Sequence, residues 1–359
     1  MTWWSLILYI TIKVALRKHF CKRAYLLKIC KRDWEQEESS VSNRRVTGLW
    51  KNWGAGVLAL SLFLAGCGAA SENATSDSNE RKDTIRVVTT IAQIAEPISV
   101  IGGDKVQVES LMGPGVDPHL YNATQGDIKK LESGDIIFYN GIHLEGNMVE
   151  IFKQIGKKKP VTAIAESIPQ DKLLKDETGQ LDPHVWFDID LWKIALGSAT
   201  EELKKAAPQH ADLFEANKTK YFAELDTLKQ ESLEKLRQIP QEKRVLVTAH
   251  DAFGYFGRIQ EMKVVGLQGL STEDEIGISD IQTTINLLLE HQIPAVFVES
   301  SINQNSIKAV IEGAASAGLD IKLGGELFSD AMGDAGTPEG TYLGMYRHNV
   351  ETIYQALKP

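Results

Sequence analysis

The chain has 359 residues, of which 43% are hydrophobic and 24% charged, and 39 lysines and arginines against 48 aspartates and glutamates leave a net charge of −9. This composition is ordinary for a globular protein, so it excludes a wholly disordered, collagen-like or coiled-coil chain, and three cysteines are too few for a disulfide scaffold. The acidic balance argues against a nucleic-acid partner, because binding phosphates needs a basic face.

The N-terminal part of the chain differs from the rest. Basic residues outnumber acidic ones in residues 1–66, whereas the remainder is acidic. Residues 1–43 form an extension with an apolar stretch at 3–16 and a basic stretch at 17–32. Two interpretations are open, a second membrane segment or a start assigned too far upstream, and we favour the second. The extension is therefore left out of the fold prediction.

A candidate export signal follows the extension. An apolar run at 54–65 comes after two arginines and a lysine and leads into Leu64-Ala-Gly-Cys67. A positive region, an apolar run of roughly 7–15 residues and small residues at the cut are typical of a secretory signal, and the run is too short to span a membrane. Leu-Ala-Gly-Cys resembles the bacterial lipoprotein box. We therefore predict a lipoprotein signal peptide at 44–66, lipidation of Cys67, and a flexible polar tether at 67–83.

From residue 84 on, short apolar or β-branched runs alternate with amphipathic stretches. The runs predict strands at 85–90, 106–111, 135–139, 244–248, 295–299 and 321–323. Helices are predicted at 124–132 with Thr124 as N-cap, from a capping box at 279–282 through residue 290, and at 340–357. This alternation predicts an α/β fold of mostly parallel sheets covered by helices.

A long helical region at 191–238, broken at Pro208, separates two halves. After the break, apolar residues recur at helical period: Phe214, Tyr221, Leu225, Leu228 and Leu236. About 30 helical residues would span on the order of 45 Å, enough for the height of a two-lobed molecule. We predict an N-terminal lobe at 84–207, a rigid linking helix at 208–239 and a C-terminal lobe at 240–359. The ligand site is then expected in the cleft between the lobes.

Two histidines occur in identical settings. His119 and His184 each end an Asp-Pro-His tripeptide. Proline fixes its own φ and restricts the residue before it, so each tripeptide is a stiffened loop that presents an imidazole. Stiff presentation suits a preformed metal site. Repetition of the motif favours a metal site over two unrelated histidines.

Two further candidates lie in the second half. His250 stands at the carboxyl end of the strand that begins at residue 244, and its neighbour Asp251 is a plausible N-cap of the next helix, while Asp330 follows the last strand. Three imidazoles and a carboxylate could enclose a divalent transition ion and leave no position for water, as in a carrier. From spacing alone, Asp330 fits a helix cap as well as a ligand.

Several stretches together resemble the metal-binding lipoproteins of ABC importers, the zinc- and manganese-type solute-binding proteins. The matching stretches are 111–127, 140–148, 182–188, 247–257, 266–275, 296–301 and 324–349, spread over the whole body. The residues of these stretches are most similar to those of the manganese-binding branch from Gram-positive bacteria. The resemblance implies that His119, His184, His250 and Asp330 are the metal ligands, two from each lobe. It also implies two α/β lobes joined by one rigid helix.

The resemblance further implies a function and partners. The protein would be a monomer, lipid-anchored on the extracellular face of a Gram-positive-type membrane, that hands a metal ion to an ABC permease and its ATPase. Three imidazoles suit zinc, and many manganese members carry Glu where His250 stands. However, residues 145–181 contain no histidine, unlike the His-rich loop of many zinc-specialised relatives. We therefore expect Mn²⁺, with Zn²⁺ as the next candidate and Fe²⁺ as a third.

Other functions and residues were weighed against this interpretation. A zinc hydrolase would need an open coordination position, and the chain has no His-Glu-x-x-His, Gly-x-Ser-x-Gly or Walker A motif. Surface adhesion is another function often attached to this family, but no residues of this sequence point specifically to it. Among the remaining residues, His143 is expected near the site or on the surface and His348 at the surface or a helix cap. Glu299 is the alternative carboxylate.

Overall fold

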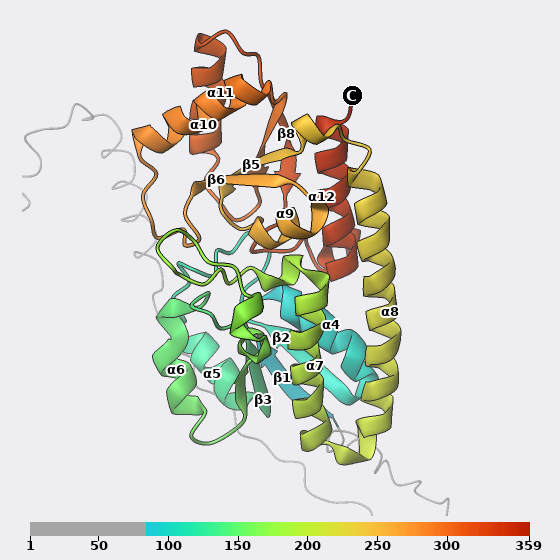
Figure 1. Cartoon of the computed structure of the whole chain (residues 1–359). Coiled ribbons are helices and arrows are strands. Elements are labelled where there is room, and N and C mark those ends of the chain that lie inside the picture. The colour runs from blue at the N-terminus through green and yellow to red at the C-terminus, as the bar shows by residue number, and fades with distance from the viewer. Residues whose placement is uncertain (1–83) are drawn as a thin grey trace, which may run out of the picture. The chain divides into compact units, whose positions relative to one another are not determined.

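The structure, a computed structural model, describes residues 84–359 (Figure 1). All of them belong to one compact unit, Asn73–Pro359. The predicted extension, signal peptide, lipidated Cys67 and tether lie outside the described residues. No helix in the described part of the chain combines the length and the apolar character that crossing a membrane requires. We use the names N-terminal lobe for residues 84–207 and C-terminal lobe for residues 240–359.

The N-terminal lobe is built on a parallel four-stranded sheet in the order β2-β1-β3-β4. Its strands are β1 (Ile85–Thr89), β2 (Val106–Ser110), β3 (Ile136–Tyr139) and β4 (Val161–Ala163). The central strands β1 and β3 are almost entirely buried, as expected for a parallel sheet with helices on both faces. The helices of this lobe are α4 (Ala92–Gly102), α5 (Gln125–Ser133), α6 (Val149–Ile155) and α7 (Ile189–Ala206).

The C-terminal lobe contains two parallel two-stranded ladders, β5-β6 and β7-β8, with β5 lying against β7. The strands are β5 (Val245–His250), β6 (Lys263–Gln268), β7 (Ala295–Glu299) and β8 (Lys322–Leu327). The helices are α9 (Gly254–Gln260), α10 (Ile278–His291), α11 (Asn305–Ser316) and α12 (Tyr342–Leu357). The predicted α/β class with parallel sheets covered by helices is confirmed.

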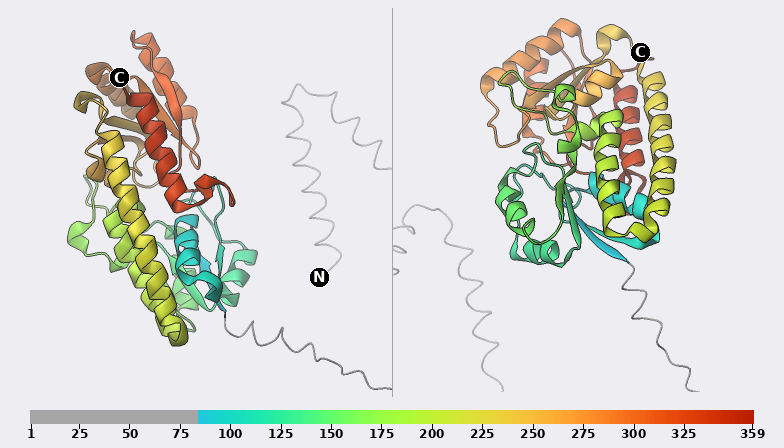
Figure 2. Two further views of the ribbon diagram at one scale, coloured as in Figure 1. Left: turned by 90° about the vertical axis from the view of Figure 1, so that its right-hand side faces the viewer. Right: turned by 60° about the horizontal axis from the view of Figure 1, so that its bottom comes forward.

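Helix α8 (Ala211–Leu236) runs along both lobes (Figures 1 and 2). It packs against α4 and α7 of the N-terminal lobe and against α12 and α9 of the C-terminal lobe. The predicted apolar stripe is buried, and Ser232 completes it. The predicted break also exists, because a short 3-10 turn, Pro208–His210, separates α7 from α8. A helix of 26 residues is about 39 Å long, so one straight element supports both lobes.

Some strands were missed or shortened in the sequence-based prediction. The short strand β4 and the strand β6 were not predicted at all. The last strand, predicted at 321–323, extends to Leu327, because Gly324 and Gly325 lie inside β8 instead of ending it. A Cβ on Gly324 would stand 2.6 Å from the ring of Phe297, so only glycine lets the two strands approach at this point. Gly325 adopts a φ of 138°, beside a register shift at Val296/Phe297.

The predicted helix caps had mixed outcomes. Thr124 caps α5 as expected. Its backbone N–H donates to the carboxylate of Asp127, and the backbone N–H of Asp127 donates to the hydroxyl of Thr124. The capping box predicted at 279–282 is wrong: α10 begins at Ile278, and Asp280 accepts the N–H of Gly277. Asp251 does not cap α9, which begins at Gly254. The last helix begins two residues late, because Thr341 caps it.

Candidate metal centre

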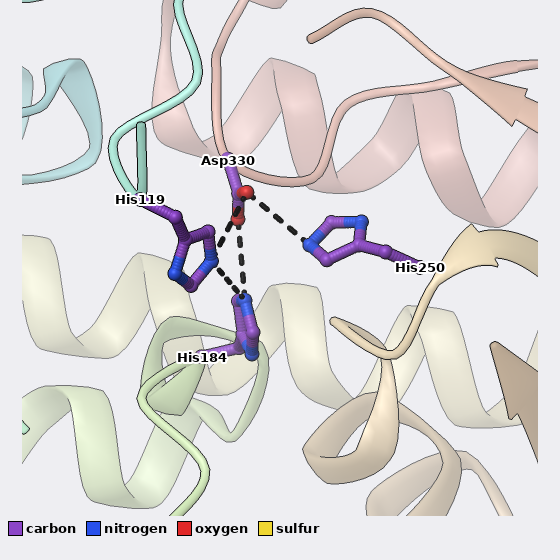
Figure 3. A group of neighbouring side chains, drawn as sticks. All are labelled: His119, His184, His250 and Asp330. Atoms are coloured by element: carbon purple, nitrogen blue, oxygen red, sulfur yellow. Dashed lines mark hydrogen bonds and ion pairs between the residues drawn. The ribbon is translucent and has the colours of Figure 1, made fainter. Parts of the chain in front are cut away.

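Four side chains from two lobes converge at one point of the cleft (Figure 3). They are His119, His184, His250 and Asp330, and each offers a ligand atom within 4.8 Å of the other three. All four are buried, and His119, with 3% of its surface exposed, is the most accessible. The structure therefore brings together the four residues that the family resemblance implies as metal ligands.

His119 follows β2 and is held by its own loop. The backbone N–H of His119 donates to Oδ1 of Asp117 at 2.9 Å, so the first residue of the Asp-Pro-His tripeptide closes a tight turn around the proline. The imidazole Nε2 then lies 3.3 Å from Nε2 of His184 and 3.5 Å from Oδ2 of Asp330.

The second tripeptide has the same turn and one additional contact. Oδ1 of Asp182 accepts the backbone N–H of His184 at 2.9 Å and also lies 2.7 Å from its Nδ1. With Nδ1–H directed at Asp182, the other ring nitrogen, Nε2, faces the centre, 3.4 Å from Oδ1 of Asp330. The Trp186 ring packs edge-on against the imidazole, with centroids 5.3 Å apart.

His250 and Glu299 lie at the carboxyl ends of the adjacent strands β5 and β7. Oε1 of Glu299 accepts the backbone N–H of His250 at 2.8 Å, and Oε2 lies 2.6 Å from Nδ1 of the same residue. The imidazole Nε2 is thereby turned to the centre, 3.2 Å from Oδ2 of Asp330. Glu299 therefore supports the imidazole of His250 from behind and is not itself one of the four converging groups.

Asp330 lies just beyond β8 in a loop that the N-terminal lobe helps to hold. The carbonyl of its neighbour Ser329 accepts hydrogen bonds from Nε2 of Gln93 at 3.0 Å and from Nε1 of Trp186 at 3.2 Å. Both carboxylate oxygens of Asp330 are buried and accept no hydrogen bond in the described residues. A buried carboxylate is costly unless positive charge balances it, which protonated His184 and His250 supply without metal and a metal ion would supply when bound.

The pKa values of the four groups all depart from their usual values, because the groups are buried and lie close to other charges. Burial opposes the charged form of His184, but Asp182 and Asp330 outweigh it and raise its pKa to about 9. The pKa of His250 is raised well above its usual value, since Glu299 and Asp330 outweigh its burial. Burial lowers the pKa of His119 to about 3. The pKa of Asp330 falls well below its usual range because, against its burial, His250 and His184 stabilise the anion.

The spacing of the donor atoms suits a transition ion. An ion about 2.1 Å from four tetrahedral ligands holds those ligand atoms about 3.4 Å apart. The four contacts given above range from 3.2 to 3.5 Å. The two oxygens of Asp330 face different imidazoles, Oδ1 towards His184 and Oδ2 towards His119 and His250, so the carboxylate can present one or both oxygens to an ion.

The other predicted residues lie elsewhere. His143 is exposed, with a φ of 63°. His348 is partly buried on α12, and its Nε2 lies 3.0 Å from the carbonyl of Glu326. The sequence analysis missed the supporting roles of Gln93 and Ser329, which contact each other across the lobes. No local motif marks them, because their partners are set by the packing of the lobes.

Comparison with known proteins identifies the family and agrees with the fold. Residues 87–356 match the family described as zinc-uptake complex component A, periplasmic. The chain belongs to this family. It is 50% identical over 305 residues to the manganese-binding lipoprotein MntA of Bacillus subtilis, covering 85% of this chain and 98% of that protein. It is 31% identical over 310 residues to the manganese ABC transporter substrate-binding lipoprotein PsaA of Streptococcus mitis, covering 84% and 97%.

A solved structure is similar as well. The periplasmic zinc-binding protein TroA of Treponema pallidum superposes with a TM-score of 0.75 at 44% identity, covering 77% of this chain and all of that chain. All three relatives are thus named as metal-binding or metal-transport proteins, and the family is one of solute-binding transport proteins. The predicted family and the two-lobed α/β fold are confirmed.

Proposed function

We propose that this protein captures Mn²⁺ between its lobes through His119, His184, His250 and Asp330 and delivers it to an ABC permease for import. The observation that carries the proposal is the buried convergence of these four groups, whose ligand atoms lie within 4.8 Å of one another. Two carboxylate oxygens without hydrogen bonds lie at its centre. A divalent cation would satisfy these oxygens and balance the charge of Asp330.

The ligands come from both lobes, so the ion itself would join the lobes. His119 and His184 belong to the N-terminal lobe, and His250 and Asp330 to the C-terminal lobe. An ion that binds only the closed native form stabilises it by RT ln(1 + [L]/Kd), roughly 2.7 kcal/mol at a hundredfold excess over Kd. Capture and closure are then one event, which is what a carrier that must later release its cargo requires.

Manganese is favoured by the carboxylate and by the relatives. Carboxylate oxygens suit Mn²⁺, and Asp330 offers both of its oxygens. The relatives from Bacillus subtilis and Streptococcus mitis are named for manganese. Zinc is the second candidate, because three imidazoles suit Zn²⁺, because zinc outranks manganese at most such sites, and because TroA is named for zinc.

The proposed attachment of this protein to the membrane is argued from its sequence. Leu64-Ala-Gly-Cys67 after an apolar run supports cleavage before Cys67 and lipidation of that residue, with the polar residues after it as a tether. Mass spectrometry of protein extracted from native membranes should find a lipid-modified N-terminus at Cys67. An intact chain upstream of residue 67 in the mature protein would refute the anchor but leave the metal site untouched.

Thermal melting of the full chain tests the metal site. Metal-stripped protein in detergent should melt at a higher temperature with Mn²⁺ or Zn²⁺, and alanine variants of the four ligands should lose most of this shift. His143→Ala is the matched control, because His143 is exposed and lies outside the cluster. If wild-type protein showed no metal-dependent shift, or if His143→Ala abolished it while Asp330→Ala kept it, the proposal would be wrong.

A further inference from the structure

The loop between β6 and α10, residues 269–277, crosses from one lobe to the other, and we call it the strap. Figure 1 shows it leaving α10 and reaching towards the N-terminal lobe. Leu270 and Thr272 of the strap are buried, whereas Glu273, Asp274 and Glu275 are exposed. The strap thus has a buried base and an acidic tip.

The base of the strap is fixed beside His250. In the parallel ladder, Gln268 at the end of β6 is the register partner of His250 at the end of β5. The carbonyl of Gln268 accepts the N–H of Asp251, the residue after the ligand, at 3.0 Å. The side-chain amide of Gln268 donates to the carbonyl of Thr272 at 2.6 Å and to that of Asp274. The conformation of the strap is therefore coupled to the strand end that carries His250.

The far side of the strap is bonded to the loop of His119. Oγ1 of Thr272 donates to Oδ2 of Asp117 at 2.6 Å. The other oxygen of the same carboxylate accepts the backbone N–H of His119 at 2.9 Å. One carboxylate therefore ties a metal-facing residue of the N-terminal lobe to the strap of the C-terminal lobe.

A hollow beside the strap leads to His119. It has a volume of about 570 Å³, and its walls include His143 and Leu181 of the N-terminal lobe and Glu273 and Asp274 of the strap. Of the four converging groups, His119 alone lines it. A second hollow, of about 710 Å³, is lined by Asp117 and Thr272 themselves and by the same acidic residues. Residues of the strap thus line two open spaces, one of which reaches His119.

The charge of the strap suits a cation. Glu273, Asp274 and Glu275 have no ion-pair partner within residues 84–359, so their charges are uncompensated there. A mouth lined by one sign of charge raises the local concentration of the opposite ion and its rate of association. The acidic tip therefore favours the approach of a divalent cation at the side where His119 is accessible.

We propose that the strap gates metal exchange, that the ion enters and leaves past His119, and that the hydrogen bond between Asp117 and Thr272 is the latch of this gate. The inference rests on the proposed metal-binding function. Thr272 is a positioning residue, since it touches no ligand atom but holds the loop that presents one. Breaking the latch frees the strap and the His119 loop together, so it speeds both release and capture.

Rapid-mixing experiments on the full chain in detergent test the latch. Mn²⁺-loaded protein is mixed with an excess of a fluorescent chelator, which gives the rate of release, and metal-free protein is mixed with Mn²⁺, which gives the rate of capture. Thr272→Val keeps the shape but removes the hydroxyl, and should speed release about tenfold, as expected for a lost hydrogen bond to a charged group. Thr272→Ser restores the hydroxyl and should return the release rate towards that of wild type.

A charge series tests the entry route. Glu273→Gln, Asp274→Asn and Glu275→Gln together should slow capture at low ionic strength and leave release nearly unchanged, and salt should erase the difference. The matched control removes three exposed carboxylates that line neither hollow, Glu132→Gln, Glu242→Gln and Glu312→Gln. This control variant carries the same change in net charge and should capture metal at the wild-type rate.

The outcomes separate this inference from the proposed function. If wild-type protein bound no metal, the function itself would fail. If wild-type protein bound metal but Thr272→Val released it at the wild-type rate, or if Thr272→Ser behaved as Thr272→Val does, the latch would be refuted. Equal slowing of capture in the strap variant and in the control variant would refute the entry route.

Discussion

Glu299 clamps His250 from behind with both carboxylate oxygens, one accepting the backbone N–H at 2.8 Å and the other lying 2.6 Å from Nδ1. The two residues end strands that lie against each other, β5 and β7, so the packing of the two ladders fixes their spacing. A carboxylate behind an imidazole selects the tautomer that leaves Nε2 free for a metal and increases the basicity of that nitrogen. Asp182 supports His184 in a related way, although one oxygen, Oδ1, makes both contacts. Two of the three imidazoles are therefore oriented by buried carboxylates.

Replacing Glu299 should weaken metal binding without removing a ligand. Glu299→Gln keeps the size of the side chain and an acceptor for the backbone N–H, but loses the negative charge behind His250. Loss of such a partner costs about 10- to 100-fold in metal affinity. Competition with a chelator of known affinity measures the change. Glu326→Gln is the control, since this carboxylate is exposed on the neighbouring strand; equal affinities for the two variants would contradict the assignment.

Gly266 should be intolerant of any side chain because of its position beside the ligand strand. A Cβ at this residue of β6 would stand 2.4 Å from the backbone N of Asp251 and 2.6 Å from the carbonyl carbon of His250. Gly266→Ala must therefore displace the strand end that carries a ligand. We expect a lower melting temperature and at least a tenfold weaker metal affinity. Gly197→Ala on α7, where a Cβ meets nothing within 4 Å, should leave the affinity unchanged.

Asp330 should distinguish manganese from zinc. Asp330→Ala removes the one anionic group of the cluster and leaves three imidazoles, which suit Zn²⁺ better than Mn²⁺. We expect the affinity for Mn²⁺ to fall by a larger factor than the affinity for Zn²⁺. Titration of both metals in parallel, for wild type and variant, gives the two factors. A larger loss for Zn²⁺ would mean that the carboxylate does not set the preference for manganese.

The ligand cluster was predictable because its signals are local. Two copies of Asp-Pro-His mark His119 and His184 as candidates, and its place at a strand end marks His250. Asp330 was ambiguous from spacing alone, and only the family resemblance chose a ligand over a helix cap. In the structure it is a group without hydrogen bonds facing three imidazoles, which local sequence cannot show.

The missed features depend on packing across the chain. Strand β6 was overlooked because Gly266 interrupts its apolar run, although this glycine is what lets β6 approach β5. Strand β8 was cut short for the same reason at Gly324 and Gly325. The link between Asp117 and Thr272 joins residues 155 positions apart, so neither local pattern contains it.

Metal binding should change the overall shape little. Helix α8 supports both lobes, and hydrogen bonds cross between them near the site, such as Tyr342 to the carbonyl of Trp186 and Tyr255 to the carbonyl of Asp182. A helix without proline, glycine or a bulge resists bending. No proline or glycine occurs between Pro208 and Pro240. Small-angle scattering profiles of metal-free and metal-bound protein should superimpose. A large compaction on metal addition would show that the linking helix does not limit domain motion.

Protons should compete with the metal up to higher pH than free histidine would suggest. From the sequence alone, affinity is expected to fall only as pH drops through about 6.5, the unperturbed pKa of histidine. In the structure the pKa of His184 is raised to about 9, and that of His250 is also raised well above its usual value. A raised pKa means that the metal-free protein keeps these protons at neutral pH, and a ligating imidazole must lose its proton first. Affinity should therefore keep rising until pH passes about 9, the pKa of His184.

Calorimetry measures the proton release directly. Titrations with Mn²⁺ at neutral pH, in buffers with different ionisation enthalpies, should show protons leaving the protein on binding, because the pKa of His184 is raised to about 9. His119, whose pKa is lowered to about 3, should release none. Asp182→Asn removes the charge beside His184, so its pKa falls and the protein should release fewer protons at neutral pH. Identical heats in all buffers, or an affinity that stops rising above about 6.5, the unperturbed histidine value, would refute this account of the metal-free site.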